Sequence, residues 1–308
     1  MTLNRLTIGT RGSRLALWQA EWVRSRIIER YPEYEVSLKK IKTSGDMILD
    51  VPLARVGGKG LFVKEIEEAM FRKEIDIAVH SMKDVPTEFP RGLGLVCITE
   101  RDDPRDALIS RGVVFADLPQ GARIGTSALR RQAQLLSVRP DLEMVEIRGN
   151  VESRIRKMES EKLDAVVLAA AGLKRLGLAG LVTEYLPPGL SLPAIGQGAL
   201  GLECRLEDAA TREALSFLND PVTAFCVGAE RSFLRRCEGG CQVPIAAHGE
   251  MSGVELRLAA FIGSVDGGRS VRGSVSGPAE SCEALGAELA DQLLARGGRE
   301  ILQEVYGK

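Results

Sequence analysis

The sequence predicts an α/β fold, with two similar α/β domains that face a central cleft and a smaller α+β C-terminal domain. Three observations indicate this. Short apolar runs alternate with amphipathic helical stretches, as in α/β domains with largely parallel sheets. Two stretches of the first 200 residues repeat the same short motifs in the same order. After about Pro221 the pattern changes to strands joined by short, hairpin-type connections.

The first stretch is predicted to contain four strands and two helices. Ser13 can cap the first helix, and the Asp84-Val85-Pro86 break separates the last two strands. A glycine-rich loop at 43–60 precedes the second helix. The predicted strands are 3–8, 34–41, 75–80 and 93–98, and the predicted helices are 13–30 and 61–73.

The second stretch repeats this alternation and two of its motifs. Ile8-Gly9-Thr10 before Ser13 resembles Ile124-Gly125-Thr126-Ser127, and the run at 76–79 resembles the run at 164–167. Such turns expose backbone N–H groups and hydroxyls at a helix N-terminus, where anions bind, although ordinary N-capping explains either turn equally well. The predicted strands are 107–110, 123–125, 142–147 and 165–170, and the predicted helices are 127–138 and 151–161.

The glycine- and proline-rich segment 190–205 is expected to return the chain to the first domain. Beyond it, helices are predicted at 221–236 and 280–294, and strands at 243–247, 254–262 and 270–275. The predicted domains are therefore residues 1–99 with 200–218, residues 100–199, and residues 219–308.

Composition excludes several classes of protein. The chain has 308 residues, 44% of them hydrophobic, which is enough for two or three buried cores. A net charge of −1 gives no long-range field that would attract nucleic acid or a membrane surface. There is no apolar run long enough to cross a bilayer and no secretory signal pattern. We expect a cytoplasmic protein, and the six scattered cysteines are expected to be thiols.

Arginine is unusually frequent among the basic residues, since 30 of the 41 are Arg. Arg binds carboxylate or phosphate through two parallel hydrogen bonds, although a compositional bias toward Arg would give the same count. Several arginines stand at helix starts or just after strands, where α/β domains bind ligands. Together with Arg11 they could line a cleft with donors for several carboxylates: Arg130, Arg131, Arg148, Arg154 and Arg175.

Two further segments contain candidate reactive groups. His80-Ser81-Met82-Lys83-Asp84 directly follows an apolar strand, so Asp84 could stabilise a developing cation or move protons, or it could simply cap the turn. His80 is expected to be a structural histidine. Cys241 follows two glycines, which suits an attachment point as well as a buried thiol. The isolated Cys237-x-x-x-Cys241 spacing argues against a metal site.

Eight motifs together resemble the hydroxymethylbilane synthase family, also called porphobilinogen deaminase, in the family's order along the chain. They are 9–16 (GTRGSRLA) with Gln19, 56–62 (VGGKGLF), 80–86 (HSMKDVP), 125–132 (GTSALRRQ), 148–151 (RGNV), 171–176 (AGLKRL), 193–198 (PAIGQG) and 238–244 (EGGCQVP). This resemblance implies two domains like type II periplasmic binding proteins. It also implies a dipyrromethane cofactor attached through a thioether to Cys241. The implied reaction condenses four porphobilinogen molecules, with loss of ammonia at each step, and then releases linear hydroxymethylbilane by hydrolysis.

The resemblance also assigns roles to individual residues. Asp84 is implied as the catalytic carboxylate and also contacts the cofactor. The other implied cofactor-binding residues are Lys83, Ser13, Ser127, Arg130 and Arg131. The implied substrate-binding residues are Arg11, Arg148, Arg154, Arg175, Ser81 and Thr126, and Arg55, Lys59 and Phe62 match a loop over the active site. Monomers are usual in the family.

Two positions depart from the family pattern. Arg55 stands where some relatives have Lys, and Arg14 stands where proline is frequent, so the role of Arg14 is open. The main alternative function is a non-catalytic, two-lobed anion-binding protein, which would not need the Gly-Gly-Cys loop. A thiol-dependent transferase or redox enzyme that uses Cys241 directly lacks a paired base or a Cys-x-x-Cys motif.

Overall fold

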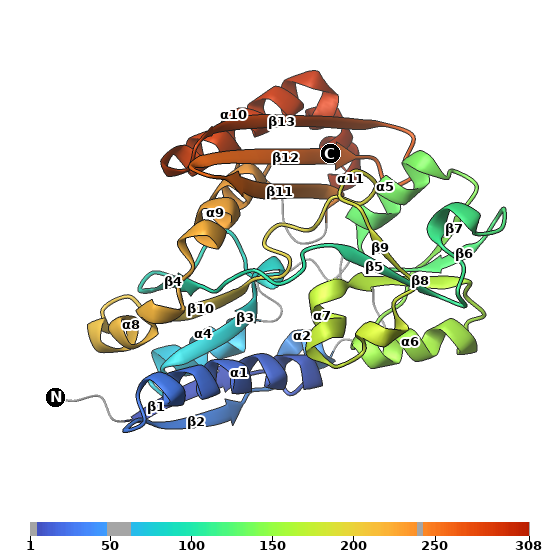
Figure 1. Cartoon of the computed structure of the whole chain (residues 1–308). Helices are drawn as coiled ribbons and strands as arrows, with labels where there is room; N and C mark the ends of the chain where they lie inside the picture. The colour runs from blue at the N-terminus through green and yellow to red at the C-terminus, as the bar shows by residue number, and fades with distance from the viewer. Residues whose placement is uncertain (1–4, 48–62, 239–242, 308) are drawn as a thin grey trace. The chain divides into compact units, whose positions relative to one another are not determined.

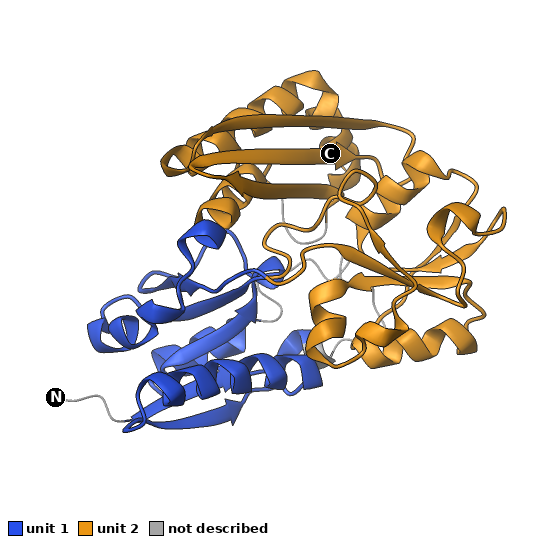
Figure 2. Cartoon of the chain, viewed as in Figure 1, with its two compact units in different colours: residues 1–101, 199–224 blue, residues 102–198, 225–308 orange. Residues whose placement is uncertain are grey.

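The computed structural model describes residues 5–47, 63–238 and 243–307 and divides the chain into two compact units (Figures 1 and 2). The first unit comprises residues 1–101 and 199–224, and the second comprises residues 102–198 and 225–308. The predicted cleft and the division into three domains stay predictions.

The first unit is built on one five-stranded sheet with helices on both faces. Its strands are β1 (Arg5–Thr10), β2 (Glu35–Lys40), β3 (Ile77–Ser81), β4 (Leu93–Ile98) and β10 (Leu200–Arg205). Its helices are α1 (Arg14–Arg30), α2 (Ser44–Met47), α4 (Lys64–Phe71) and α8 (Ala209–Leu215), with short 3-10 turns η1 (Met82–Asp84) and η4 (Ser216–Leu218). Apolar side chains of α1, α8 and η4 pack on one sheet face, and those of α4 pack on the other.

The second unit contains a five-stranded sheet and a three-stranded sheet. The larger sheet has strands β5 (Asp106–Ser110), β6 (Arg123–Gly125), β7 (Glu143–Val145), β8 (Ala165–Ala169) and β9 (Glu184–Leu186). It carries helices α5 (Leu129–Val138), α6 (Val151–Ser160) and α7 (Ala170–Arg175), with 3-10 turns η2 (Phe115–Asp117) and η3 (Ala179–Leu181). Two apolar clusters, one on each face, form its core.

The smaller sheet is an antiparallel meander of β11 (Ile245–Ser252), β12 (Glu255–Gly263) and β13 (Ser270–Pro278). The helices α9 (Pro221–Arg236), α10 (Cys282–Leu293) and α11 (Arg299–Tyr306), with the turns η5 (Ala279–Ser281) and η6 (Leu294–Gly298), accompany it, and all three helices contribute to its core. Phe261 on the other face packs with Ala133 of α5. The prediction of an α+β arrangement after about residue 220 is confirmed.

The two five-stranded sheets have the same strand order, which confirms the predicted similarity. The orders are β2-β1-β3-β10-β4 and β7-β6-β8-β5-β9. In each, four of the five strands run in the same direction. The fifth, β10 or β5, comes from a distant part of the sequence and pairs antiparallel with both of its neighbours. The prediction of largely parallel sheets is therefore confirmed for strand direction, although the inserted strand makes half of the pairings in each sheet antiparallel.

The repeated motifs also make the same contacts. Asp76 accepts a hydrogen bond from the backbone N–H of Thr7 at 2.9 Å, and Asp164 accepts one from the N–H of Arg123 at 2.7 Å. A Cβ atom on Gly9 would lie 2.4 Å from Cδ1 of Ile75, and one on Gly125 would lie 2.7 Å from Cδ1 of Leu163. Each glycine therefore allows a buried side chain to pack directly against the strand end.

In the described ranges, no helix is long and apolar enough to cross a bilayer. Five cysteines fall within those ranges, and all five are free thiols, as predicted: Cys97, Cys204, Cys226, Cys237 and Cys282.

Candidate functional site

Asp84 lies at the end of a short, well-anchored turn after β3. The backbone N–H of Met82 donates to the carbonyl of Ala199 at 3.0 Å, and that of Val85 donates to the carbonyl of Met82. The Met82 side chain is buried beside Gly201, where any side chain on residue 201 would collide with the Met82 sulfur. Pro86 prevents the turn from continuing as a helix. Asp84 is exposed, so the fold does not use its carboxylate as a buried structural group.

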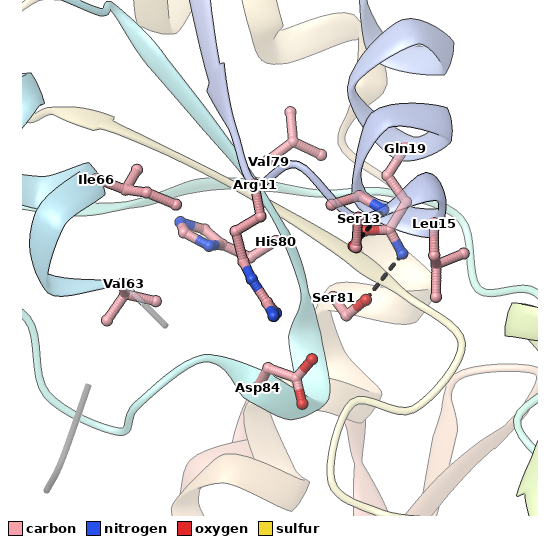
Figure 3. A pocket seen from close by; sticks show the side chains of 11 residues that line it. Arg11, Ser13, Leu15, Gln19, Val63, Ile66, Val79, His80, Ser81 and Asp84 are labelled. Carbon is pink, nitrogen blue, oxygen red and sulfur yellow. Dashed lines mark hydrogen bonds between the residues drawn. The ribbon is translucent and has the colours of Figure 1, made fainter. Parts of the chain in front are cut away.

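An open pocket lies beside Asp84 (Figure 3). Figure 3 shows the Arg11 guanidinium extending toward the Asp84 carboxylate, with Ser13 and Ser81 at the side. The turn before α1, the first turns of α1, β3, η1 and the start of α4 all contribute to the wall. The lining residues are Arg11, Ser13, Leu15, Ala16, Gln19, Val63, Ile66, Val79, His80, Ser81 and Asp84.

The hydroxyl groups of this pocket are held in place by hydrogen bonds. Ser13 is the N-cap of α1 and accepts from the backbone N–H of Ala16 at 3.3 Å, which is the capping role that the sequence left open. Ser81 accepts from Nε2 of Gln19 at 2.8 Å. The positive end of the α1 dipole adds to the charge of Arg11. This wall is therefore suited to bind an anion, and Asp84 adds an acceptor for N–H groups.

His80 and two buried carboxyl groups lie behind the pocket wall. Nε2 of His80 is 2.8 Å from Oε2 of Glu203, and both side chains are almost fully buried. Burial and the charge of Glu203 raise the pKa of Glu67 to about 7, although His80 opposes this rise. Sequence analysis missed Glu67 and Glu203. A single acidic residue inside the apolar run Leu-Gly-Leu-Glu-Cys was the available signal for Glu203.

In the second unit, Arg130 and Arg131 both bind the carboxylate of Asp106. Arg130 makes two hydrogen bonds to Asp106, at 2.7 and 2.9 Å, and Arg131 makes one at 2.7 Å. Ser191 and Gln197 donate to the same carboxylate. Burial would raise the pKa of Asp106, but the two arginines outweigh it and hold that pKa well below its usual range.

Three other predicted binding residues of the second unit, Thr126, Ser127 and Arg148, follow strand ends, and Arg154 lies in the first turn of α6. Thr126 and Ser127 lie between β6 and α5, and the Thr126 hydroxyl accepts from the backbone N–H of Ala128 at 3.3 Å. Arg148 precedes Gly149, whose φ of +115° disfavours other residues. Arg154 donates from Nε to the carbonyl of Gly149 at 2.8 Å.

Arg175 ends α7, and its buried side chain donates to the carbonyl of Gly198 at 2.6 Å.

Not every predicted site residue falls within the described ranges. Lys83 does, and it is half-buried in η1 beside Asp84. Arg55, Lys59, Phe62 and Cys241 lie outside the described residues. Within the first unit, the structure brings Arg11, Ser13, Ser81 and Asp84 to one pocket.

Comparison with family models matches almost the whole chain. Residues 6–213 match the model "Porphobilinogen deaminase, dipyromethane cofactor binding domain", and residues 224–295 match "Porphobilinogen deaminase, C-terminal domain". A curated protein of Geobacter sulfurreducens named porphobilinogen deaminase is 74% identical over 306 residues, covering 99% of this chain and 96% of that protein. A curated protein of Geotalea uraniireducens with the same name is 72% identical over 306 residues, again covering 99% of this chain and 96% of that protein.

Similar solved structures include two binding proteins. A probable amino-acid ABC transporter extracellular-binding protein of Bacillus subtilis has a TM-score of 0.41 at 10% identity, over 70% of this chain and 91% of that chain. The periplasmic aliphatic sulphonate binding protein of Escherichia coli has a TM-score of 0.41 at 14% identity, over 75% of this chain and 70% of that chain.

Proposed function

The chain belongs to the porphobilinogen deaminase family, and from this we propose that it is a hydroxymethylbilane synthase, a transferase of tetrapyrrole and haem biosynthesis. It joins four porphobilinogen molecules, releases ammonia at each addition, and frees linear hydroxymethylbilane by hydrolysis. Each porphobilinogen brings two carboxylates, so the growing chain accumulates negative charge that the enzyme must neutralise. The Asp84 pocket, with Arg11, Ser13 and Ser81 around one carboxylate, is the observation that carries this proposal.

The donor set of the pocket fits a dipyrromethane cofactor, which the family model names. Guanidinium and hydroxyl donors match its carboxylates, and an exposed aspartate matches its pyrrole N–H groups. When bound, the cofactor supplies the free pyrrole carbon from which the chain grows. We assign its thioether attachment to Cys241, and its carboxylate and N–H contacts to Lys83, Ser13, Ser127, Arg130, Arg131 and Asp84.

Asp84 is the proposed catalytic carboxylate. When a pyrrole N–H group lies against its Oδ atoms, the ionised carboxylate stabilises the positive charge that develops on the ring as ammonia leaves. Because the turn that carries Asp84 is anchored through the buried Met82, little reorganisation is needed when that charge appears. Lys83, its neighbour in η1, contributes a cation for a carboxylate of the same ligand.

The remaining predicted residues are proposed to hold the substrate chain. Arg11 and Ser81 act in the first unit, and Thr126, Arg148, Arg154 and Arg175 act in the second. The loop residues Arg55, Lys59 and Phe62 are proposed to cover the active site. We propose further that the protein acts as a cytoplasmic monomer without nucleic acid, which size-exclusion chromatography with light scattering and cell fractionation would test.

Intact mass of the purified protein tests the function directly. Wild type is expected to be heavier than its sequence mass and to give a pyrrole colour with an acidic aldehyde reagent, whereas Cys241→Ser is expected to have the sequence mass. Cys237→Ser, which changes another cysteine of the same region, is the control and should keep the adduct. A wild-type protein that matches its sequence mass and releases no ammonia from porphobilinogen would instead support a non-catalytic anion-binding protein.

A further inference from the structure

Three ionisable side chains of the first unit lie together between the sheet and α4. His80 is on β3, Glu203 is on β10 and Glu67 is on α4. The register pairs Gly201 with His80 and Ala78 with Glu203, so His80 and Glu203 project from the same face of the sheet. Ala78 packs with α4, so this is the face that α4 covers. All three side chains are buried, with exposed fractions of 7%, 0% and 8%.

The hydrogen bond between His80 and Glu203 fixes which ring nitrogen can change its protonation. When Glu203 is ionised, its carboxylate only accepts hydrogen bonds, so Nε2 of His80, at 2.8 Å, then carries the hydrogen of this bond. In that state Nδ1 is the ring nitrogen that can accept a further proton. His80 also lines the pocket that contains Asp84 and Arg11. The ring therefore connects the pocket with the buried carboxyl groups.

Other charged groups near this cluster are engaged elsewhere. Arg205, on the same face of β10, binds Asp76 at 2.7 Å and Asp208 at 3.1 Å. On α4, Glu65 accepts from the backbone N–H of Ser44 at 2.8 Å. On the pocket side, the charged groups that line the wall are Arg11 and Asp84.

The carboxylate of Glu203 is itself only half satisfied. Its Oε1 is buried and has no hydrogen-bond partner among the residues that the structure describes. Two buried carboxyl groups and one imidazole must therefore share their protons, because two ionised carboxylates beside a neutral ring would be strongly disfavoured there. The raised pKa of Glu67, about 7, agrees with this arrangement.

We propose that His80 is the proton acceptor of this pocket. Its Nδ1 takes up the proton that is released each time two rings are joined. Glu203 is a positioning residue that holds the ring, and Glu67 acts on the charge of the ring from nearby. This rests on the proposed function. In that reaction the terminal pyrrole of the growing chain loses a hydrogen from a ring carbon and forms a bond to carbon there. The incoming porphobilinogen loses ammonia from its aminomethyl group. After the new bond has formed, Nδ1 accepts the proton and passes it to water at the open pocket, so His80 returns to its neutral form and each addition releases one ammonia and one proton.

A direct test measures the protonation of His80 without measuring turnover. The chain contains only two histidines, His80 and His248, so ¹⁵N-histidine NMR signals can be assigned with the single variant His248→Gln. The proposal requires that His80 gain and lose a proton as the pH of the sample is varied. In Glu203→Gln the midpoint of this titration is expected to move by about one pH unit or more, because the facing charge is gone. A His80 ring that stays in one protonation state throughout would overturn the proposal.

The second test compares pH profiles of turnover. His80→Gln is expected to lower kcat by about 10²- to 10⁴-fold, the usual contribution of a proton-transfer group. Glu67→Gln, which keeps the shape and removes the charge, is expected to shift the pH profile of kcat while leaving KM unchanged. His248→Gln serves as the control, because His248 is also buried beside a glutamate, Glu230, but lies in the second unit.

The outcomes separate this inference from the proposed function. Full kcat and an unchanged pH profile in His80→Gln would reject the role of His80, even if Cys241→Ser lost its adduct as expected. If His80→Gln does not fold, the pH profile and NMR titration of Glu67→Gln decide the question, and no shift in either would reject the proposal. A wild-type protein without adduct or turnover would reject the proposed function, while the NMR result would still report on the cluster.

Discussion

Arg130 and Arg131 show what a local sequence pattern can and cannot predict about single residues. Their place after a strand-to-helix turn predicted anion binding, and both do hold a carboxylate, but that carboxylate belongs to Asp106. Asp106 lies 24 residues before Arg130, and no local motif connects them. Asp84 and Ser13, in contrast, are placed by short turns beside their own strand or helix, so the sequence could locate them.

Replacing Asp84 with Asn tests the carboxylate that the proposed mechanism needs. The variant is expected to lose about 10²- to 10³-fold in kcat, because a neutral amide does not stabilise positive charge on the ring. Its Tm should not change, since Asp84 is exposed. Asp117→Asn is the matched control, because Asp117 is also exposed and also ends a 3-10 turn. Equal rates for the two variants would remove Asp84 from its proposed role.

Replacing Asp106 with Asn tests the buried charge cluster. The change leaves two buried guanidinium groups without a carboxylate, so the free energy of unfolding is expected to fall by about 3–5 kcal/mol at pH 7. The pKa of Asp106 is lower in the folded chain than in the unfolded chain. Its stabilisation is therefore complete above the unfolded value of about 3.9 and is lost as the pH falls toward the folded value.

Urea denaturation at several pH values measures both expected effects of the Asp106 change. Asp141→Asn provides the comparison, because Asp141 forms a more exposed pair with Arg139 and its loss should matter far less. If Asp106→Asn were as stable as Asp141→Asn at pH 7, the cluster would not stabilise the fold.

At the scale of helices and strands, periodicity located most elements, but it could not pair them. The strands β4 and β6 and the helix α9 have the predicted bounds, and α1 begins one residue after the predicted start because Ser13 is its cap. The predicted return segment 190–205 ends in β10, a strand whose six residues are all buried. Alternation alone could not show that β10 and β5 insert antiparallel, because their partners are distant in sequence.

The repeated glycines make a prediction at this scale. Gly125→Ala would place a Cβ atom 2.7 Å from Cδ1 of Leu163 and 2.8 Å from Cδ1 of Ile147. Overpacking of this kind costs about 1–3 kcal/mol, so a lower Tm is expected. In Gly180→Ala, no atom lies within 4 Å of the new Cβ atom, so the Tm should be nearly unchanged.

Ile147→Val in the Gly125→Ala background removes one of the clashing methyl groups, so part of the stability should return. No recovery, or an equal loss in Gly180→Ala, would contradict the packing argument.

For the whole molecule, the proposed binding residues belong to both compact units, and this has a measurable consequence. A ligand that contacts groups of both units stabilises both, whereas a ligand held by one unit stabilises only that unit. Wild type carrying its cofactor is therefore expected to exchange backbone amide hydrogens more slowly than Cys241→Ser in two separate sets of segments. One set is 10–19 with 80–84 in the first unit, and the other is 124–131 with 148–154 in the second.

Hydrogen exchange followed by mass spectrometry measures this comparison. The helix α11 is the internal control, because none of the proposed cofactor contacts lies in it, and its exchange should be equal in the two proteins. Adding 1 M salt should not abolish the difference, because the thioether keeps the cofactor attached while the ions screen only exposed charges. Protection confined to the first unit would show that Ser127, Arg130 and Arg131 do not hold the cofactor, and their proposed contacts would have to be withdrawn.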